Sequence, residues 1–577
     1  MASNKTMANP VSPQRVFRAI HETVQSSVDP LGVFMPMMSA QWAWLTHPQE
    51  LAEAAAEFST RMMGLQWYSC QRMLGLPGKD VEEPNPDDTR FADPIWQESA
   101  TWDLTKEWYL TYTHHIQDML FQTPGLSSRD RRRAAFWWRK WLNAMAPTNF
   151  LLTNPVAMQK AAASNGESLI RGMRNFLDDL RAGNIRMTRP DDFKVGVNLA
   201  ATPGKVVLQN RLLELIHYAP TAAKVHHVPL LIVTPWINKF YILDLVPKKS
   251  MIKFLLEQGI DVYITSWKNP DAAMADVGFD DYVTEGIDAA VAAVRSISRS
   301  AKVNAAGYCI GGTALATYLA WANRRFAPKN VPIACASFFT TLVDFHKPGD
   351  IEVFLDEGSY QYLTRKMQEK GYLDGQEMAA AFRLLRSNSL IWHYVVHGYL
   401  YGETPPPFDV LFWNMDTTRM PARMHSWYLR NLYLDNKLIR KDALEVAGQL
   451  IDLTCIVQPV YAVTAADDHI APWRQVFRIN NYVSGPKRFV LSSSGHILGI
   501  VNPVVNPPKR EYWVAPAERH DNPDGWHEHA AHHPGSWWSD WMEWLKPLSG
   551  ELAKPGPLAN KIYPAMADAP GTYVLEV

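Results

Sequence analysis

A cysteine set among glycines, where an apolar run meets a helical pattern, constrains this chain more than any other feature. The stretch is Asn304-Ala-Ala-Gly-Tyr-Cys-Ile-Gly-Gly312. Residues 303–306 are typical of a short buried strand, and residues 313–322 have apolar side chains at helical spacing. We therefore expect a tight strand-to-helix turn with Cys309 at its tip, because glycine tolerates the backbone that such a turn requires.

This arrangement is that of a nucleophile elbow, G-x-Nuc-x-G, with cysteine at the nucleophile position. The helix that follows directs its partial positive charge at the sulfur and favours the thiolate over the thiol. A buried free cysteine is also a common structural residue of protein cores. The flanking glycines favour the catalytic interpretation, because a core cysteine does not need them.

Strand and helix patterns alternate on both sides of this turn, from about Phe193 onward. Such alternation predicts a mainly parallel sheet covered by helices. The alternation stops between about 344 and 452, where helical and aromatic segments suit an inserted cap. The predicted strands are 206–208, 212–217, 229–233, 259–267, 303–306, 333–342, 460–464 and 488–491.

Two domains are expected from these patterns. Residues 1–192 are predicted to form a helical N-terminal domain, and residues 193–577 an α/β-hydrolase-type catalytic domain with the cap at about 344–452. The formal net charge of −1 argues against general nucleic-acid binding, and the four cysteines lie too far apart for a disulfide framework. No apolar run approaches the length of a membrane span, so we expect a cytoplasmic protein.

An acid and a histidine follow the elbow in the order that this fold requires. Asp468 and His496 each come directly after a predicted strand. We expect His496 to take the proton of Cys309, and Asp468 to hold the correct imidazole tautomer and to stabilise the imidazolium. The neighbours Asp467 and His469 are alternatives that the sequence leaves open.

The remaining chemistry of the site is expected from backbone amides. The amide of Ile310 follows the nucleophile, and a second oxyanion donor is expected in the loop after residues 229–233, at Trp236 or Ile237.

A histidine group near the C-terminus is better explained as loop residues than as metal ligands, so we expect no metal and no cofactor. The group consists of His520, His527, His529, His532 and His533.

Several ordered motifs surround these residues. They are Gly307-Tyr-Cys-Ile-Gly-Gly312, Asp468-His-Ile-Ala-Pro-Trp473, Gly495-His-Ile497, Pro235-Trp-Ile-Asn-Lys-Phe-Tyr-Ile-Leu-Asp-Leu245, Phe412-Trp-Asn-Met-Asp416, Met424-His-Ser-Trp-Tyr-Leu-Arg430 and Gly535-Ser-Trp-Trp538. Read together, they resemble the class I polyhydroxyalkanoate synthases, from about residue 90 to the C-terminus. The resemblance implies Cys309 as the acylated nucleophile, with His496 and Asp468 as its partners. It also implies substrate-channel roles for Trp413, Tyr428 and Asn436, and a place for Arg386 near the coenzyme A path or the cap.

The resemblance further implies an acyltransferase that polymerises (R)-3-hydroxyacyl-CoA and releases coenzyme A through an acyl-cysteine. The sister class that favours medium-length chains usually has serine where this chain has Ile310, so a short-chain substrate such as 3-hydroxybutyryl-CoA is expected. The implied partners are the growing polyester, a second copy in a homodimer, and granule-associated proteins. The implied location is on cytoplasmic polyester granules.

Two other functions stay open at this point. The same triad serves a thioesterase or a polyester hydrolase, because the fold does not decide the acyl acceptor. A granule-surface binding protein with an inactive site is the non-enzymatic alternative. Competent residues at all three triad positions argue against an inactive site.

Overall fold

The computed structural model describes residue 29 and residues 32–76, 81–82 and 88–577. The chain divides into two compact units. Unit 1 contains the described residues up to Met187 together with Val353–Leu363 and Phe382–Pro405, and unit 2 contains Thr188–Glu352, Thr364–Ala381 and Pro406–Val577. Two stretches of the predicted cap thus belong to unit 1. Residues 1–28 of the predicted N-terminal domain lie outside the described part.

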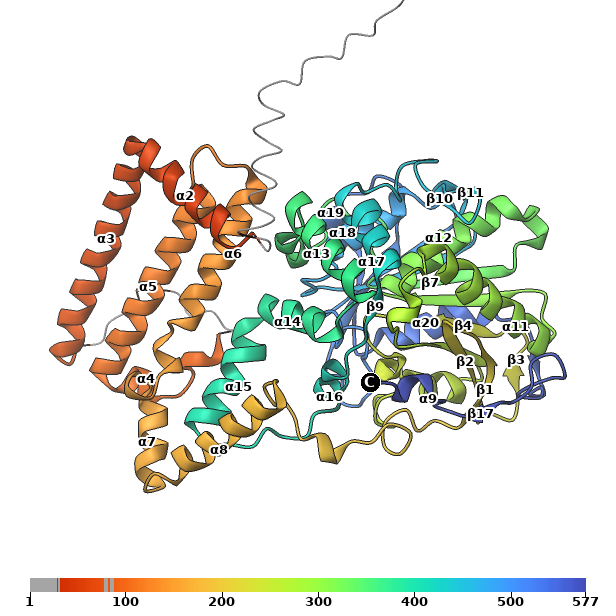
Figure 1. Cartoon of the computed structure of the whole chain (residues 1–577), viewed down its shortest axis with the longest axis horizontal. Helices are drawn as coiled ribbons and strands as arrows, with labels where there is room; N and C mark the ends of the chain where they lie inside the picture. The colour runs from red at the N-terminus through yellow and green to blue at the C-terminus, as the bar shows by residue number, and fades with distance from the viewer. Residues whose placement is uncertain (1–28, 30–31, 77–80, 83–87) are drawn as a thin grey trace, which may run out of the picture. The chain divides into compact units, whose positions relative to one another are not determined.

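Unit 1 is mainly helical, as predicted (Figure 1). The helix pairs α3 and α5, α5 and α6, and α2 and α6 pack against each other. Small clusters of buried apolar side chains lie between the helices, and one of them contains Phe91, Trp96 and Tyr109. The α-helices of the described residues before 188 are α2 (Phe34–Thr46), α3 (Pro48–Met73), α4 (Ile95–Glu98), α5 (Ala100–Gln122), α6 (Ser128–Ala144), α7 (Pro155–Ala163) and α8 (Glu167–Ala182), and the stretch from the predicted cap adds α15 (His393–Val395).

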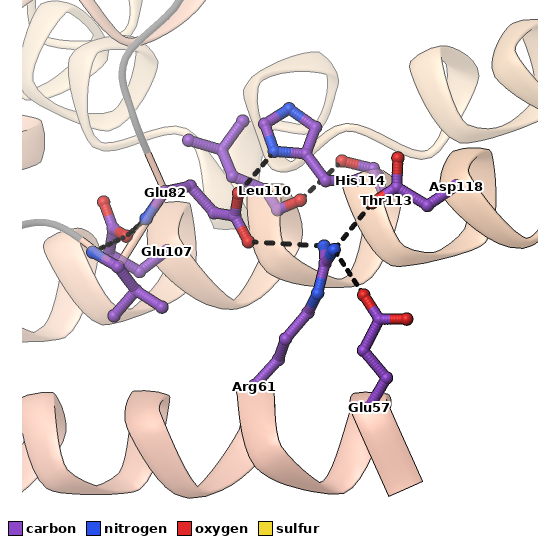
Figure 2. Close-up of polar contacts among 9 residues, drawn as sticks. Glu57, Arg61, Glu82, Glu107, Leu110, Thr113, His114 and Asp118 are labelled. Atoms are coloured by element: carbon purple, nitrogen blue, oxygen red, sulfur yellow. Dashed lines mark hydrogen bonds and ion pairs between the residues drawn. The ribbon is translucent and has the colours of Figure 1, made fainter. Parts of the chain in front are cut away.

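A polar network joins α3 to α5 inside this unit (Figure 2). Arg61 lies 2.7 Å from Asp118, 2.9 Å from Glu57 and 3.9 Å from Glu82, and His114 Nδ1 lies 2.7 Å from Glu82. Partial burial opposes the charge of the guanidinium, but its carboxylate partners outweigh this effect and raise the pKa of Arg61. The network therefore ties two helices and the short segment 81–82 together by charge.

Unit 2 contains, within the described residues, an 11-stranded sheet in the order β15-β14-β13-β12-β7-β6-β4-β5-β2-β1-β17. The central strands β5, β4, β6, β7, β12 and β13 run parallel, and the edge strands are antiparallel. The sheet is mainly parallel, as predicted. The bounds are β1 (Gly204–Gln209), β2 (Leu213–Tyr218), β4 (Leu230–Val233), β5 (Val262–Trp267), β6 (Val303–Tyr308), β7 (Ile333–Phe339), β12 (Val460–Ala465), β13 (Lys487–Ser492), β14 (Glu511–Pro516), β15 (Ala531–Pro534) and β17 (Ala567–Asp568).

Four of the central strands are buried along their whole length, which explains their nearly continuous apolar sequences. All four residues of β4, Leu-Leu-Ile-Val, are buried, and so are all residues of β5, β6 and β12. The predicted strand positions are confirmed for these elements. The core of unit 2 thus holds the carboxyl ends of the parallel strands in fixed positions.

Helices pack on this sheet (Figure 1). They include α9 (Met251–Glu257), α11 (Ala289–Ser298), α12 (Ile310–Arg325) and α20 (Trp537–Leu545). Between β7 and β12 the chain is mainly helical, as the loss of alternation predicted. In unit 2 this insertion includes α16 (Asp409–Met415), α17 (Ala422–Tyr428) and the π-helical segment η12 (Leu429–Leu434).

Candidate active site

Strand β6 ends directly before Cys309, and helix α12 begins directly after it. Cys309 has φ 53° and ψ −124°, a backbone conformation that residues other than glycine rarely adopt. Its amide donates to the carbonyl of Phe339 at the end of β7, and its own carbonyl accepts from the amides of Gly312 and Thr313. Neighbouring elements therefore hold the strained residue, and the predicted strand-to-helix turn is confirmed.

The glycines around the cysteine are required by close backbone contacts. A Cβ added to Gly307 would collide with the Cα of Gly312, and one added to Gly312 would collide with the Thr341 side chain. A Cβ on Gly311 would lie 2.6 Å from the carbonyl oxygen of Thr234, after β4. The elbow thus brings the start of α12 against the main chain that leaves the neighbouring strand.

Asp468 and His496 meet at this edge of the sheet. His496 Nδ1 lies 2.6 Å from Asp468 Oδ2, and the side chain of Asp468 is fully buried. The second carboxylate oxygen, Oδ1, accepts from the amides of Ile470 (2.9 Å) and Ala471 (2.8 Å). A Cys309 thiolate acts on His496 both through its charge and as a hydrogen-bond partner. The structure therefore brings together the three residues that the sequence selected.

The two sequence alternatives take other positions. Asp467 is exposed, and its amide donates to the carbonyl of Ser494. The carbonyl of His469 accepts from the amide of Asp350. Neither side chain occupies the place beside His496 that Asp468 fills.

The electrostatics of His496 are those of a charged imidazole. Burial disfavours its positive charge, but the charges of Asp468 and of a Cys309 thiolate, with their hydrogen bonds, outweigh burial and raise the pKa of His496 to about 10. His496 is therefore favoured as an imidazolium near neutral pH, and a positive charge beside a cysteine sulfur stabilises the thiolate form. A thiolate is the nucleophilic form of cysteine, so the arrangement is suited to attack on a carbonyl group.

The loop that carries His496 is fixed by buried aromatic residues. The hydroxyl of Tyr308, one residue before the cysteine, donates to the carbonyl of His496 (3.2 Å), and the two rings stack at 5.8 Å. The indoles of Trp537 and Trp538 donate to the carbonyls of Gly499 and Ile500 (2.9 Å each). The tryptophan-rich helix α20 thus holds the segment that follows the histidine.

The two predicted oxyanion donors lie at the beginning of α12 and after β4. Ile310 is the first residue of α12, and Ile237 is in the loop that leaves β4. The Trp413 indole donates to the carbonyl of Lys239 in this loop (2.7 Å). The hydroxyl of Thr418 lies within hydrogen-bond distance of the carbonyls of Trp236 and Ile237. Trp413 is therefore a support of this loop.

An aromatic cluster lies at the end of the insertion. Phe345 packs edge-to-face on Tyr433 (4.9 Å) and Tyr428 (6.2 Å), and the two tyrosine rings are 5.3 Å apart. Burial raises the pKa of both tyrosines, and the charge of a Cys309 thiolate adds to this effect. The cluster therefore forms an apolar wall that carries two hydroxyl groups.

Asn436 supports this wall through both polar atoms of its amide. Its Oδ1 accepts from the amide of Phe345 (2.9 Å), and its Nδ2 donates to Asp344 (2.9 Å). The carboxylate of Asp344 is fully buried and also accepts from Tyr482 (2.7 Å) and Arg478 (2.5 Å). Burial opposes its charge, but these donors outweigh burial and lower the pKa of Asp344. Asn436 therefore links the insertion to the segment that follows β7.

Arg386 is the one residue named from the resemblance that belongs to unit 1; the others, Trp413, Tyr428 and Asn436, belong to unit 2 with the triad. Several supporting residues were not predicted, namely Tyr308, Asp344, Thr418 and Tyr433. Only Tyr308 carried a sequence signal, since it stands beside the cysteine in the elbow.

Comparison with known proteins agrees with this arrangement. Residues 87–255 match the family model described as "Poly-beta-hydroxybutyrate polymerase (PhaC) N-terminus", and residues 229–503 match "alpha/beta hydrolase fold". The chain is 39% identical over 567 residues to the poly(3-hydroxyalkanoate) polymerase subunit PhaC of Rhizobium etli, with 96% of this chain and 88% of the relative covered. The chain belongs to the poly(3-hydroxyalkanoate) polymerase family.

Two further relatives extend the similarity to this polymerase family. The chain is 41% identical over 538 residues to the poly(3-hydroxyalkanoate) polymerase of Methylorubrum extorquens, with 92% of this chain and 88% of the relative covered. It is 40% identical over 493 residues to the subunit PhaC of Cupriavidus necator, with 84% and 83% covered. The predicted family, the α/β-hydrolase fold and the acyltransferase class of enzyme are confirmed.

A helix that crosses a bilayer has to be long and apolar. Across residues 32–76 and 88–577, no helix combines the length and the apolar character that a membrane crossing needs.

Proposed function

We propose that this polymerase-family enzyme converts (R)-3-hydroxyacyl-CoA into polyester and releases coenzyme A through an acyl-cysteine at Cys309. The observation that carries the proposal is the grouping of Cys309, His496 and Asp468 at the elbow of an α/β-hydrolase fold, with His496 Nδ1 2.6 Å from Asp468. The names of the relatives support the polyester product.

In the first step, the Cys309 thiolate attacks the carbonyl carbon of the acyl-CoA thioester. The amides of Ile310 and Ile237 stabilise the oxyanion that forms. The bond from carbon to the coenzyme A sulfur then breaks, and the departing thiolate takes the proton of the His496 imidazolium. One thioester replaces another, so the acyl group stays reactive and His496 is left neutral.

In the second step, neutral His496 removes the proton of a 3-hydroxyl group, from another acyl unit or from the growing polyester. The hydroxyl oxygen attacks the acyl-Cys309 carbonyl, and Cys309 departs as a thiolate. An ester bond forms, and the product is one unit longer. The proton now on His496 restores the ion pair, while Asp468 keeps Nδ1 protonated throughout the cycle.

The proposed substrate has a short acyl chain. Ile310 occupies the position where the sister class for medium-length chains usually has serine. The description of the matching N-terminal family model, which specifies polyhydroxybutyrate, also supports 3-hydroxybutyryl-CoA. The apolar wall of Phe345, Tyr428 and Tyr433 supports the exclusion of water, which would otherwise hydrolyse the acyl-enzyme.

We also propose that the enzyme works as a homodimer on cytoplasmic polyester granules, with granule-associated proteins as partners. This part is supported by the resemblance of the motifs. Sedimentation of the purified chain with and without substrate tests the dimer, since a monomer under both conditions contradicts it.

The test of the activity is release of coenzyme A from (R)-3-hydroxybutyryl-CoA, with the acyl product identified, for the wild type and for Cys309→Ala. Insoluble polyester from the wild type and no release by the variant are expected. Soluble 3-hydroxybutyrate as the only product would instead identify a thioesterase. Release that persists in Cys309→Ala would exclude the proposed nucleophile.

A further inference from the structure

The loop after β4, residues 234–239, lies between the start of α12 and the insertion. The carbonyl oxygen of Thr234 lies so close to Gly311 of α12 that an added Cβ would be only 2.6 Å away. The amide of Thr234 donates to the hydroxyl of Thr265 on β5 (3.0 Å), and the Thr234 hydroxyl donates to the Thr265 carbonyl (2.7 Å). The first residue of the loop is thus fixed to the sheet and to the helix that follows the cysteine.

The next residues of the loop are held by the insertion. The hydroxyl of Thr418 lies 2.8 Å from the carbonyl oxygen of Trp236 and 2.6 Å from that of Ile237. Thr418 is only 5% exposed, so water does not compete for these contacts. Further along, Lys239 Nζ lies 2.7 Å from Asp416. The insertion therefore contacts the loop through the carbonyls of two consecutive residues, Trp236 and Ile237.

The contact with Trp236 has a consequence for the amide of Ile237. The carbonyl of residue 236 and the amide of residue 237 belong to one planar peptide, and in a trans peptide the C=O and N–H bonds point in opposite directions. A donor that fixes the carbonyl therefore also fixes the direction of the N–H. Thr418 holds this carbonyl from the side of the insertion, so the Ile237 amide is directed away from it.

We propose that Thr418 is a positioning residue that aims the Ile237 amide at the oxyanion formed during acylation of Cys309. This inference rests on the proposed function, which makes that amide the second oxyanion donor beside Ile310. It also distinguishes between the two sequence candidates: the Ile237 amide shares its peptide with the carbonyl that Thr418 holds, while the Trp236 amide belongs to the preceding peptide.

A hydroxyl group is essential to this role, and the methyl group of the same side chain is not. Without the hydroxyl, the buried carbonyl of Trp236 and the partly buried carbonyl of Ile237 lose the donor that they share, and their peptides are free to rotate toward other donors. The amide would then move with its carbonyl, and the oxyanion would lose an aligned hydrogen bond. Substrate binding before the reaction does not depend on that hydrogen bond, so loss of the hydroxyl should lower kcat and leave KM nearly unchanged.

The test uses Thr418→Val, which keeps the shape and removes the hydroxyl, and Thr418→Ser, which keeps the hydroxyl. We expect kcat for coenzyme A release to fall about 10- to 100-fold in the valine variant with KM nearly unchanged. The serine variant should restore most of the rate. Thr417→Val is the matched control, because it removes a hydroxyl one residue earlier, and its rate should remain near that of the wild type.

A second measurement separates oxyanion stabilisation from damage to the nucleophile. Iodoacetamide alkylates a thiolate by displacement at carbon and forms no oxyanion. Alkylation of Cys309 should therefore be equally fast in the wild type and in Thr418→Val. Parallel loss of alkylation and acylation, a wild-type acylation rate in Thr418→Val, or no recovery in Thr418→Ser would each overturn the proposal.

Folding and the nature of the product are controlled separately. Thr418→Ala provides a second variant without the hydroxyl, and if neither it nor Thr418→Val folds, the residue serves folding and the proposal is wrong. If the wild type yields hydroxy acid and no polyester, the proposed function fails. The role of Thr418 would still be measurable, because the first acyl transfer forms the same oxyanion.

Discussion

Replacement of Asp468 by asparagine tests the triad at its most constrained contact. In the wild type, Oδ1 accepts from the amides of Ile470 and Ala471, and Oδ2 accepts from His496 Nδ1. An asparagine must keep its oxygen on the two amide donors, so its NH2 group faces His496. Two donors then meet, and the imidazole changes tautomer, which leaves no lone pair directed at Cys309.

The size of the effect follows from the charge state of His496. Its pKa is about 10 instead of the ordinary 6.5, and each pKa unit corresponds to about 1.4 kcal/mol, so the site favours the imidazolium by about 5 kcal/mol. The charge of Asp468 is the largest of the causes that raise this pKa, and burial opposes them, so its loss should lower the pKa of His496 toward the ordinary value. At pH 7.5 the fraction of His496 in the imidazolium form would then fall from nearly all molecules to a minority, about a tenth for an imidazole with the ordinary pKa of 6.5.

Alkylation of Cys309 by iodoacetamide, followed by mass spectrometry between pH 6 and 9.5, measures the thiolate that this imidazolium stabilises. We expect Asp468→Asn to react about 10-fold more slowly at pH 7.5 or slower still, and coenzyme A release to fall about 10³- to 10⁴-fold. The matched control is Asp467→Asn, at the exposed neighbour, which should stay within about twofold of the wild type in both assays. A wild-type alkylation profile in Asp468→Asn would refute the reasoning.

Three further predictions concern the support of the site. Gly307→Ala should lower the free energy of unfolding, measured in urea, by about 1–3 kcal/mol or more, because the added Cβ meets backbone atoms. The control is Gly525→Ala, where the atom nearest to an added Cβ is 3.9 Å away. Equal losses of stability in the two variants would contradict the prediction. Asp344→Asn should lower the free energy of unfolding by about 3 kcal/mol at pH 7, because a buried hydrogen-bond network loses its charge. Because the pKa of Asp344 is lowered in the folded protein, its carboxylate contributes fully to stability above about pH 3.8, and this contribution disappears as the pH falls through the pKa of the folded state. The same difference in free energy of unfolding between wild type and variant at pH 7 and at pH 3 would be evidence against the prediction. Tyr308→Phe should slow coenzyme A release about 2- to 10-fold by freeing the carbonyl of His496, and an unchanged rate and pH profile would show that this hydrogen bond positions nothing.

The catalytic candidates could be predicted because each depends on a local pattern. Cys309, Asp468 and His496 each follow an apolar strand, and β6, β12 and β13 lie where the sequence placed them. The carboxyl ends of parallel strands meet at one edge of a sheet, so residues far apart in the chain meet there. Strand pattern and chain order therefore led to these three side chains, but the structure was needed to separate Asp468 from its neighbours Asp467 and His469.

The supporting residues could not be predicted, because their partners are set by the path of the insertion. Thr418 meets main-chain carbonyls 181 and 182 residues earlier in the chain, and no motif marks a threonine whose partners are backbone atoms. Asp344 reaches Asn436 across 92 residues. Three edge strands, β14, β15 and β17, were also missed. Strand β17 has only two residues, and β15 contains His532 and His533, which were expected in a loop; His527 and His529 of the same group lie in the helix Pro523–His529.

The backbone of Cys309 has a consequence for anyone who tries to make this enzyme more robust. A residue with φ 53° and ψ −124° carries about 1–3 kcal/mol of strain, and glycine is the residue that adopts such angles most easily. Cys309→Gly should therefore melt at a higher temperature than the wild type while having lost its sulfur. A library ranked by thermal tolerance alone would favour inactive proteins at this position, so catalytic turnover has to be scored in the same round of selection.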